Sequence, residues 1–152
     1  MTTKSISSHH LSIEKLLSPL FPLAKQFYKH AKYHSHIGRE DEVYVIRDET
    51  QNNQIIAAVR LVRMSDYLIL RSMVVSPNRR GEGVGKVLLK YLRPAIGDRE
   101  CWCFPFEWLE TLYASIGFST IENKHCPPDI LQKYLQYISQ GRKLLIMSLT
   151  HA

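Results

Sequence analysis

The feature that most constrains this chain is a glycine-rich stretch in its middle, Ser-Pro-Asn-Arg-Arg-Gly-Glu-Gly-Val-Gly-Lys at residues 76–86. An apolar run rich in β-branched residues, 67–75, precedes it and predicts a buried strand. After it, Val84, Leu88 and Leu92 recur at helical spacing, Arg93-Pro94 closes this apolar run, and Gly97-Asp98 is expected to end the helix. A strand, a glycine loop and a helix in this order direct unpaired backbone N–H groups at an anion. The stretch therefore predicts a site for a phosphorylated ligand.

The spacing of the glycines excludes two common phosphate loops. A nucleoside-triphosphate loop needs G-x-x-x-x-G-K-S/T, whereas Gly81 to Gly85 is one residue too short and Val87 stands in place of the hydroxyl. The dinucleotide fingerprint needs G-x-G-x-x-G, and this chain has G-x-G-x-G. What remains is Arg80-x-x-Gly83-x-Gly85.

That remaining pattern resembles the pyrophosphate-binding signature of the GNAT acyltransferases, Gln/Arg-x-x-Gly-x-Gly/Ala. The wider block from Leu70 to Leu89 is similar to the family's strand–loop–helix segment throughout. A second block follows about thirty residues later. There Tyr113-Ala-Ser-Ile-Gly-Phe118 looks like the family's Y-x-x-x-G-F. The two blocks together are far more specific than one glycine turn.

The resemblance implies an α/β (α+β) fold of one GNAT-like domain. Its central sheet, mixed antiparallel and parallel, would have about six or seven strands flanked by helices, with a splayed parallel pair at the acyl-CoA site. The residue pattern also predicts a helix from Ser18 to near Tyr33 and others at 107–115 and 128–139. Further strands are expected at 43–46, 54–63, 100–104, 118–121 and 143–149, with a short one within 4–13.

The ligand that the resemblance implies is acetyl-CoA or another acyl-CoA, used as acyl donor without a metal. Met73 and Val75 would bind the pantetheine arm through their main chain, and an N–H near Val74 would stabilise the oxyanion. The pyrophosphate would lie on the N–H groups of the loop and first helical turn, namely Arg80, Gly81, Glu82, Gly83, Val84, Gly85 and Lys86. The side chains of Arg80 and Lys86 would add positive charge.

Catalysis would transfer the acyl group to an unidentified amine acceptor. Tyr113 matches the family's usual acid, which protonates the sulfur of CoA; its alternative role is that of a core tyrosine. No base follows from the sequence: Glu42, Glu107, Glu110 and His125 are candidates by proximity alone, and Asp66 would qualify only if the strand before the loop were shorter than expected. Residues 33–42 and the helix from Pro128 are expected to flank the acceptor, with Glu40, Asp41 and Glu42 either attracting a cationic amine or forming a solvated loop.

The composition of the chain fits this interpretation. At 152 residues, with 45% hydrophobic and 22% charged residues, we expect a single globular domain over 1–152. No apolar run approaches a membrane span, so we expect no membrane partner and a cytoplasmic protein. The three cysteines are expected to be free thiols, since His125-Cys126 lacks the second close pair that zinc would need.

Two rival functions have to be weighed against an acyltransferase. A non-catalytic acyl-CoA-binding or sensing domain would keep the glycine loop but would not need Tyr113. A basic nucleic-acid-binding module would use the net charge of +6, yet the Lys and Arg residues are scattered. Their densest clusters, Arg60/Arg63 and Arg79/Arg80, flank the predicted phosphate site, so nucleic acid is the weaker expectation. The resemblance also allows a homodimer.

Overall fold

A single mixed sheet runs through the molecule. The computed structural model describes residues 3–6 and 10–149, in which eight strands are hydrogen-bonded in the order β1-β2-β3-β4-β5-β6-β8-β7. All neighbours pair antiparallel except β5 and β6, which are parallel. The strands are β1 (Thr3–Ile6), β2 (Leu11–Leu16), β3 (Glu42–Asp48), β4 (Gln54–Met64), β5 (Tyr67–Val75), β6 (Cys101–Cys103), β7 (Phe118–Thr120) and β8 (Met147–Leu149).

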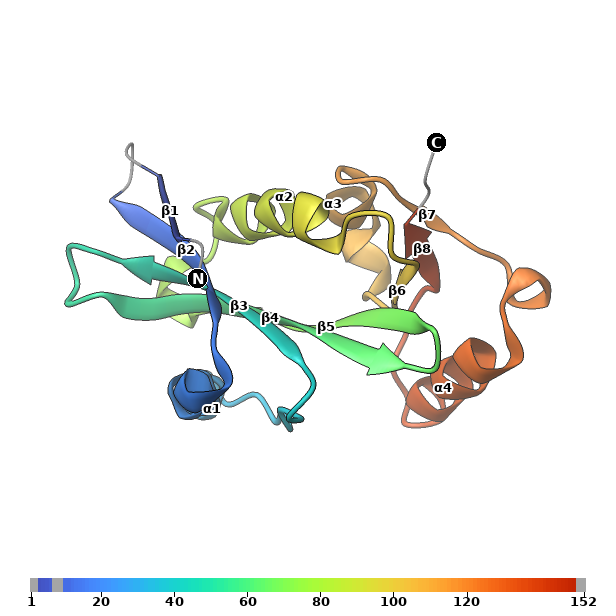
Figure 1. Ribbon diagram of the computed structural model, residues 1–152. Coiled ribbons are helices and arrows are strands. Elements are labelled where there is room, and N and C mark those ends of the chain that lie inside the picture. Colours follow the sequence, from blue (N-terminus) through green and yellow to red (C-terminus); the bar gives the residue numbers. More distant parts are fainter. Residues whose placement is uncertain (1–2, 7–9, 150–152) are drawn as a thin grey trace.

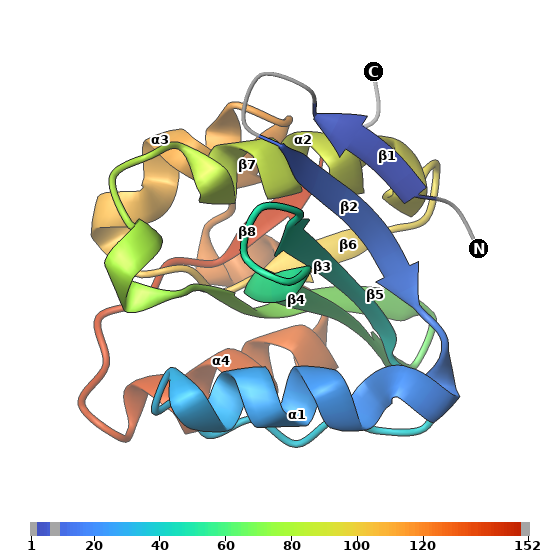
Figure 2. The ribbon, with the colours of Figure 1, turned by 90° about the vertical axis from the view of Figure 1, so that its left-hand side faces the viewer.

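Helices cover both faces of this sheet (Figures 1 and 2). On one face lie α2 (Val84–Ile96) and α3 (Glu110–Ala114), and on the other lie α1 (Phe21–His30) and α4 (Pro128–Ile138). The apolar side of α2, which includes the fully buried Leu88 and Leu92, packs on the sheet together with Tyr113 of α3. Smaller apolar clusters fill the space under α1 and under α4.

The expected fold class is confirmed, and the differences lie at the ends of elements. Residues 3–16 contribute two strands where one was expected, while residues 7–9 of that region lie outside those described. Ser18 begins a 3-10 turn rather than the α-helix itself, and α1 ends at His30. The last strand is confined to Met147–Leu149.

Pro94 closes the apolar run of α2 but lies inside the helix. The helix continues to Ile96, because a proline in the last turn removes only one backbone hydrogen bond. Gly97 stops the helix, as expected, with a positive φ of 66° that residues with a side chain rarely adopt.

The feature of the sheet that positions a site is the separation of its two parallel strands. Residues Leu68–Leu70 of β5 pair with Cys101–Cys103 of β6, and the pairing stops there. The rest of β5 is paired only with β4. The edge of β5 from Arg71 onward therefore faces a gap, and the glycine loop begins where that edge ends.

Candidate active site

A β-bulge at Ser72 starts the unpaired edge of β5. The register between β4 and β5 shifts between Ala58 and Arg60, and Ser72 has a φ of +57°. Three side chains hold this unfavourable conformation. The hydroxyl of Tyr28 donates to the carbonyl of Ser72 at 2.8 Å. Arg60 and Ser35 donate to the side-chain hydroxyl of Ser72.

Arg60 connects the bulge to the segment between α1 and β3. It is 4% exposed and pairs with Asp41 at 2.7 Å, while its guanidinium also donates to the carbonyl of His36 at 2.6 Å. Buried arginine is expensive unless it is paired and fully hydrogen-bonded, as it is here. Arg60 thus serves the fold of the bulge, and neither it nor Asp41 is available to a ligand.

Backbone alternation decides which groups of β5 face the gap. The N–H of Ser76 donates to the carbonyl of Ile56 on β4, so in the same register the N–H of Val74 also points toward β4. The N–H groups of Met73 and Val75 point the other way, into the gap. The alternation thus gives Met73 and Val75 the direction expected of residues that bind through main chain, and it turns the N–H of Val74, expected near the oxyanion, toward β4.

The glycine loop leaves open space where side chains would otherwise stand. Gly81 and Gly83 have φ values of +83° and +80°, and a Cβ atom added at either would meet nothing within 4 Å. Gly83 is the N-cap of α2, whose first N–H groups receive no side-chain cap. The loop thus offers backbone donors and room for a large anion.

Gly85 has a different reason to be glycine. A Cβ there would lie 3.2 Å from Cε of Met73 and 3.6 Å from a methyl of Val75. Its missing side chain lets the first turn of α2 approach the edge of β5. The loop and the strand edge, both expected at the site, are therefore in direct contact.

Two charged side chains of the loop, those of Arg79 and Glu82, form ion pairs within the protein. Arg79 pairs with Asp48 at 2.6 Å and with Glu82 at 3.1 Å, which ties Glu82 to the loop rather than to a ligand. Arg80 donates from Nε to the carbonyl of Val75 at 3.2 Å, so its guanidinium lies at the end of β5. Lys86 is exposed on α2, and Val84 is buried below the loop.

A cavity of about 450 Å³ lies at the other end of the gap. Met73 and Tyr113, two of the expected site residues, line it together. The rest of its wall comes from the segment after α1, from β5 and β6, and from the ends of α3 and α4. These residues are Lys32, Tyr33, His34, Leu70, Arg71, Ser72, Cys103, Phe104, Pro105, Phe106, Leu109, Tyr137, Gln140, Arg142 and Leu144.

Tyr113 reaches this cavity from α3. Tyr113 is 5% exposed, and its ring packs edge-on against Phe118. Burial raises the pKa of its phenol above the usual range. Within the described chain its hydroxyl has no hydrogen-bond partner. A buried phenol with a raised pKa stays protonated at neutral pH and can donate a proton into the cavity.

The acids expected near the acceptor are not in the cavity wall. Asp41 is paired with Arg60, and Glu42 lies in β3, where Arg99 and Tyr44 bond to its carboxylate. Burial opposes the charge of Glu42, but these hydrogen bonds outweigh it and lower its pKa. None of the base candidates Glu42, Asp66, Glu107, Glu110 or His125 lines the cavity. No group of three or more His, Cys, Asp or Glu residues that could hold a metal occurs in the part of the chain that is described.

Sequence reasoning missed the polar groups that do line the cavity. Arg71, Tyr137 and Arg142 come from β5, α4 and the turn after α4, so no spacing rule connects them. One signal was present, since Arg71 is the only charged residue in the apolar run 67–75. A charge at the centre of a buried strand needs a polar neighbour or a ligand.

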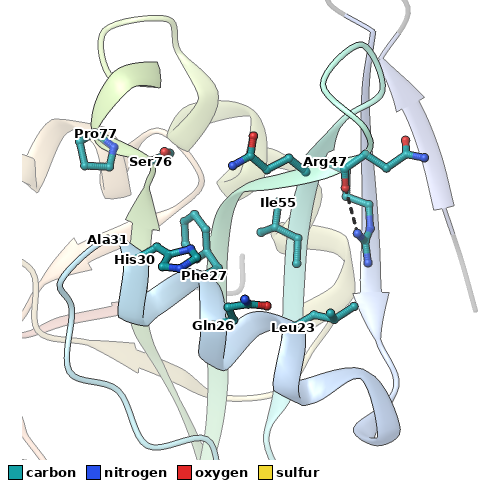
Figure 3. Close-up of a pocket in the computed structure, with 11 residues that line it drawn as sticks. Leu23, Gln26, Phe27, His30, Ala31, Arg47, Ile55, Ser76 and Pro77 are labelled. Carbon is teal, nitrogen blue, oxygen red and sulfur yellow. Dashed lines mark hydrogen bonds between the residues drawn. The ribbon is translucent and has the colours of Figure 1, made fainter.

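A second cavity, of about 340 Å³, lies between α1 and the strands β3 and β4 (Figure 3). Leu23, Gln26, Phe27 and His30 of α1 form one wall. Arg47 on the opposite wall donates to the carbonyl of Asn53 at 3.0 Å and also pairs with Glu14. No residue predicted for the site lines this cavity, so it adds nothing to the gap between β5 and β6.

The fold and the glycine loop agree with a comparison of the sequence with protein families. The model of the acetyltransferase (GNAT) domain matches residues 39–120, which is more than half of the chain. The chain therefore belongs to the GNAT acetyltransferase family. A comparison with curated proteins finds no match.

Solved structures share the fold over nearly the whole chain. A protein from Mycobacterium tuberculosis, crystallised with CoA, has a TM-score of 0.69 at 17% identity over 92% of this chain and 99% of its own. The ribosomal-protein-S18-alanine N-acetyltransferase of Escherichia coli has a TM-score of 0.64 at 21% identity, over 93% and 96%. The N-acetylglutamate synthase of Neisseria gonorrhoeae, crystallised with CoA, has a TM-score of 0.61 at 20% identity over 91% of this chain. This chain spans only 34% of that synthase.

Proposed function

We propose that this protein transfers an acetyl group from acetyl-CoA to an amine acceptor by direct attack of the amine on the thioester. The observation that carries the proposal is the continuous path formed by the glycine loop, the unpaired edge of β5 and the cavity with Tyr113. The open space above Gly81 and Gly83, which a Cβ would fill, fits a pyrophosphate on the loop. Arg80 and Lys86 would add charge beside it.

Acetyl-CoA, when bound, supplies a thioester whose C–S bond breaks as the amine nitrogen forms a bond to the carbonyl carbon. Met73 and Val75 would hold the amide-rich arm by backbone hydrogen bonds, as a neighbouring strand would. The N–H of Met73 donates to the oxygen on which charge develops. Tyr113 gives its proton to the departing sulfur and regains one from solvent, which also takes up the proton that the amine loses.

The cavity favours catalysis over simple acyl-CoA binding. A sensing domain needs only the loop and the strand edge, whereas here a cavity adjoins them and Tyr113 lines it. The nucleic-acid alternative is weakened because Arg60 and Arg79, from the densest basic clusters, are engaged in ion pairs. A cytoplasmic location and a homodimer stay predictions. In residues 3–6 and 10–149, no helix is long and apolar enough to cross a membrane.

The test is a melting experiment followed by a turnover assay. Acetyl-CoA at 100 times its dissociation constant should stabilise the fold by about 2.7 kcal/mol and so raise Tm. Acceptor-dependent release of CoA thiol then measures transfer. A shift without turnover on any amine would favour the binding domain, and a shift with duplex DNA but not with acetyl-CoA would favour the nucleic-acid module.

A further inference from the structure

Positive charge surrounds the acceptor end of the cavity. Lys32 approaches from the segment after α1, Arg71 from β5 and Arg142 from the turn after α4. No aspartate or glutamate is among the described residues that line it. A neighbouring cavity, which shares Lys32 and His34, adds only further basic and neutral side chains. A cationic polyamine would meet repulsion here, whereas an anion would be attracted.

These charges are free to meet a ligand. Among the described residues, Lys32, Arg71 and Arg142 form no ion pair. The carboxylate of Asp41, in the segment between α1 and β3, is bound to Arg60. The phosphates expected on the glycine loop are also remote from Arg71, because the strand from Arg71 to Val75 alone extends on the order of 10 Å.

Tyr137 supplies a second, independent indication of a ligand. Its hydroxyl is buried and is without a hydrogen-bond partner in the described part of the chain. The neighbouring Tyr134, by contrast, donates from its hydroxyl to the carbonyl of Leu144 at 3.0 Å. A buried O–H group without an acceptor is costly unless a ligand provides one.

The surroundings of Tyr137 favour a carboxylate as that acceptor. The guanidinium carbon of Arg71 lies 4.7 Å from the centre of the Tyr137 ring, and Phe104 fixes the ring edge-on at 5.7 Å. Arg142 lines the same cavity from the turn after α4. A hydroxyl donor and two guanidinium groups that line one cavity are a donor set suited to a carboxylate.

We propose that the acceptor is a small amino acid whose carboxylate binds Arg71, Arg142 and the hydroxyl of Tyr137. This inference rests on the proposed acetyl transfer and narrows its acceptor. The size follows from the cavity, since about 450 Å³ has to hold both the thioester end of acetyl-CoA and the acceptor. The same cations would favour the neutral form of the amine, because a nearby positive charge opposes protonation. No side-chain base in the cavity wall is then required.

The wild-type protein tests this with matched acceptors. The probes are L-alanine, L-methionine and L-glutamate, each beside its α-carboxamide, together with putrescine and an acidic peptide with a free N-terminus. We expect kcat/KM for the acids to exceed that for their amides by about 10- to 100-fold, mainly through KM. Amine reactivity alone would predict the reverse, since an α-carboxamide leaves more of its amine neutral at pH 7. Equal or better turnover of the amides or putrescine, or transfer to the peptide alone, would overturn the inference.

Single substitutions then locate the carboxylate. Arg71→Gln, Arg142→Gln and Tyr137→Phe should each raise KM for the acid, leave KM for acetyl-CoA unchanged and bring acid and amide closer together. Lys143→Gln, which removes an exposed charge next to Arg142 but outside the cavity wall, is the matched control and should keep the wild-type preference. An unaltered preference in Arg71→Gln would remove this arginine from the site.

Different results would contradict the proposed acetyl transfer and the proposed amino-acid acceptor. If acetyl-CoA causes no shift in Tm, the acetyl-transfer proposal itself fails. If acetyl-CoA binds and amines are acetylated without preference for a carboxylate, only the amino-acid inference fails. Should Arg71→Gln melt below the assay temperature, the acid-to-amide ratio of the wild-type protein still decides.

Discussion

The two ends of the gap between β5 and β6 are built in different ways. The phosphate end is one continuous segment, residues 76–86, which offers backbone N–H groups and glycines with positive φ. The acceptor end is assembled from side chains that come from several elements, among them Arg71, Tyr137 and Arg142. A backbone site of this kind suits a ligand part that never changes, whereas a side-chain site can change its ligand by single substitutions.

The largest effect on the difference between the two ends is expected from a side chain placed in the glycine loop. Gly83→Leu places a side chain above the loop in a conformation that costs on the order of 1–3 kcal/mol for such residues. Two or three charge-assisted hydrogen bonds to phosphate would also be lost. We expect the dissociation constant of acetyl-CoA, measured by calorimetry, to rise by at least roughly 100-fold.

Gly141→Leu is the matched control for that substitution. Gly141 has a φ of +84° and likewise nothing within 4 Å of an added Cβ, but it lies in the turn after α4. It carries the same backbone strain without touching the loop, so acetyl-CoA should still bind. Equal losses in both variants would mean that strain, and not the phosphate position, explains the effect.

A second substitution separates chemistry from binding at the side-chain end. Tyr113→Phe removes a hydroxyl that has no hydrogen-bond partner among the described residues, so Tm and acetyl-CoA affinity should be preserved. We expect kcat to fall by about 100-fold, the lower end of the range for general acids, because a thiolate is already a tolerable leaving group. Full turnover with a good acceptor would make Tyr113 a core residue.

Tyr28→Phe is the counterpart of that experiment on a bonded tyrosine. The hydroxyl of Tyr28 donates to the carbonyl of Ser72 at 2.8 Å in a buried position. Without it the carbonyl at the bulge is left unsatisfied, and we expect chemical denaturation to report a loss of about 1–3 kcal/mol. A stability equal to that of the wild type would show that the bulge is held by Arg60 and Ser35 alone.

The smallest expected effect concerns the ion pair that anchors the glycine loop. Hydrogen bonds from Thr50 and then from Arg79 lower the pKa of Asp48 to about 2. Because the pKa is lower in the folded state, this stabilisation is complete above the unfolded value of about 3.9 and is lost as the pH falls toward the folded value.

Asp48→Asn tests that dependence. The difference in Tm between the wild type and the variant should be constant near neutral pH and should vanish as the pH falls to about 2. Asp98→Asn, at an exposed position after α2, should show no comparable change. A difference that is independent of pH would mean that Asp48 acts as a neutral hydrogen-bond acceptor.

The sequence predicted the parts of the molecule that depend on neighbours along the chain. Strand 67–75 was expected with the bounds that the structure has, because its apolar run is delimited by Asp66 and by Ser76-Pro77. The family of the chain followed from two short motifs for the same reason. The bulge at Ser72 could not be predicted, since Tyr28 and Arg60 hold it from elements distant in sequence.

The acidic segment 40–42 is a second case in which contacts between distant elements could not be predicted from the sequence. Its charges suggested a site for a cationic amine, but Asp41 and Glu42 are neutralised by Arg60 and Arg99. Charge counted along a sequence does not reveal which side chains are already paired. The charges that remain after folding, and not those in the composition, determine the electrostatic character of the acceptor end.

The contacts around Ser72 have a thermodynamic consequence for a protein with two substrates. Ser72 begins the strand edge that would hold acetyl-CoA, and through Ser35 and Arg60 it is bonded to the segment that carries Lys32 and His34. An acceptor that moved this segment would also move the bulge through these hydrogen bonds, and the binding of the two proposed ligands would then be coupled. Linkage then requires that if bound acetyl-CoA changes the affinity for the acceptor by some factor, the bound acceptor changes the affinity for acetyl-CoA by the same factor.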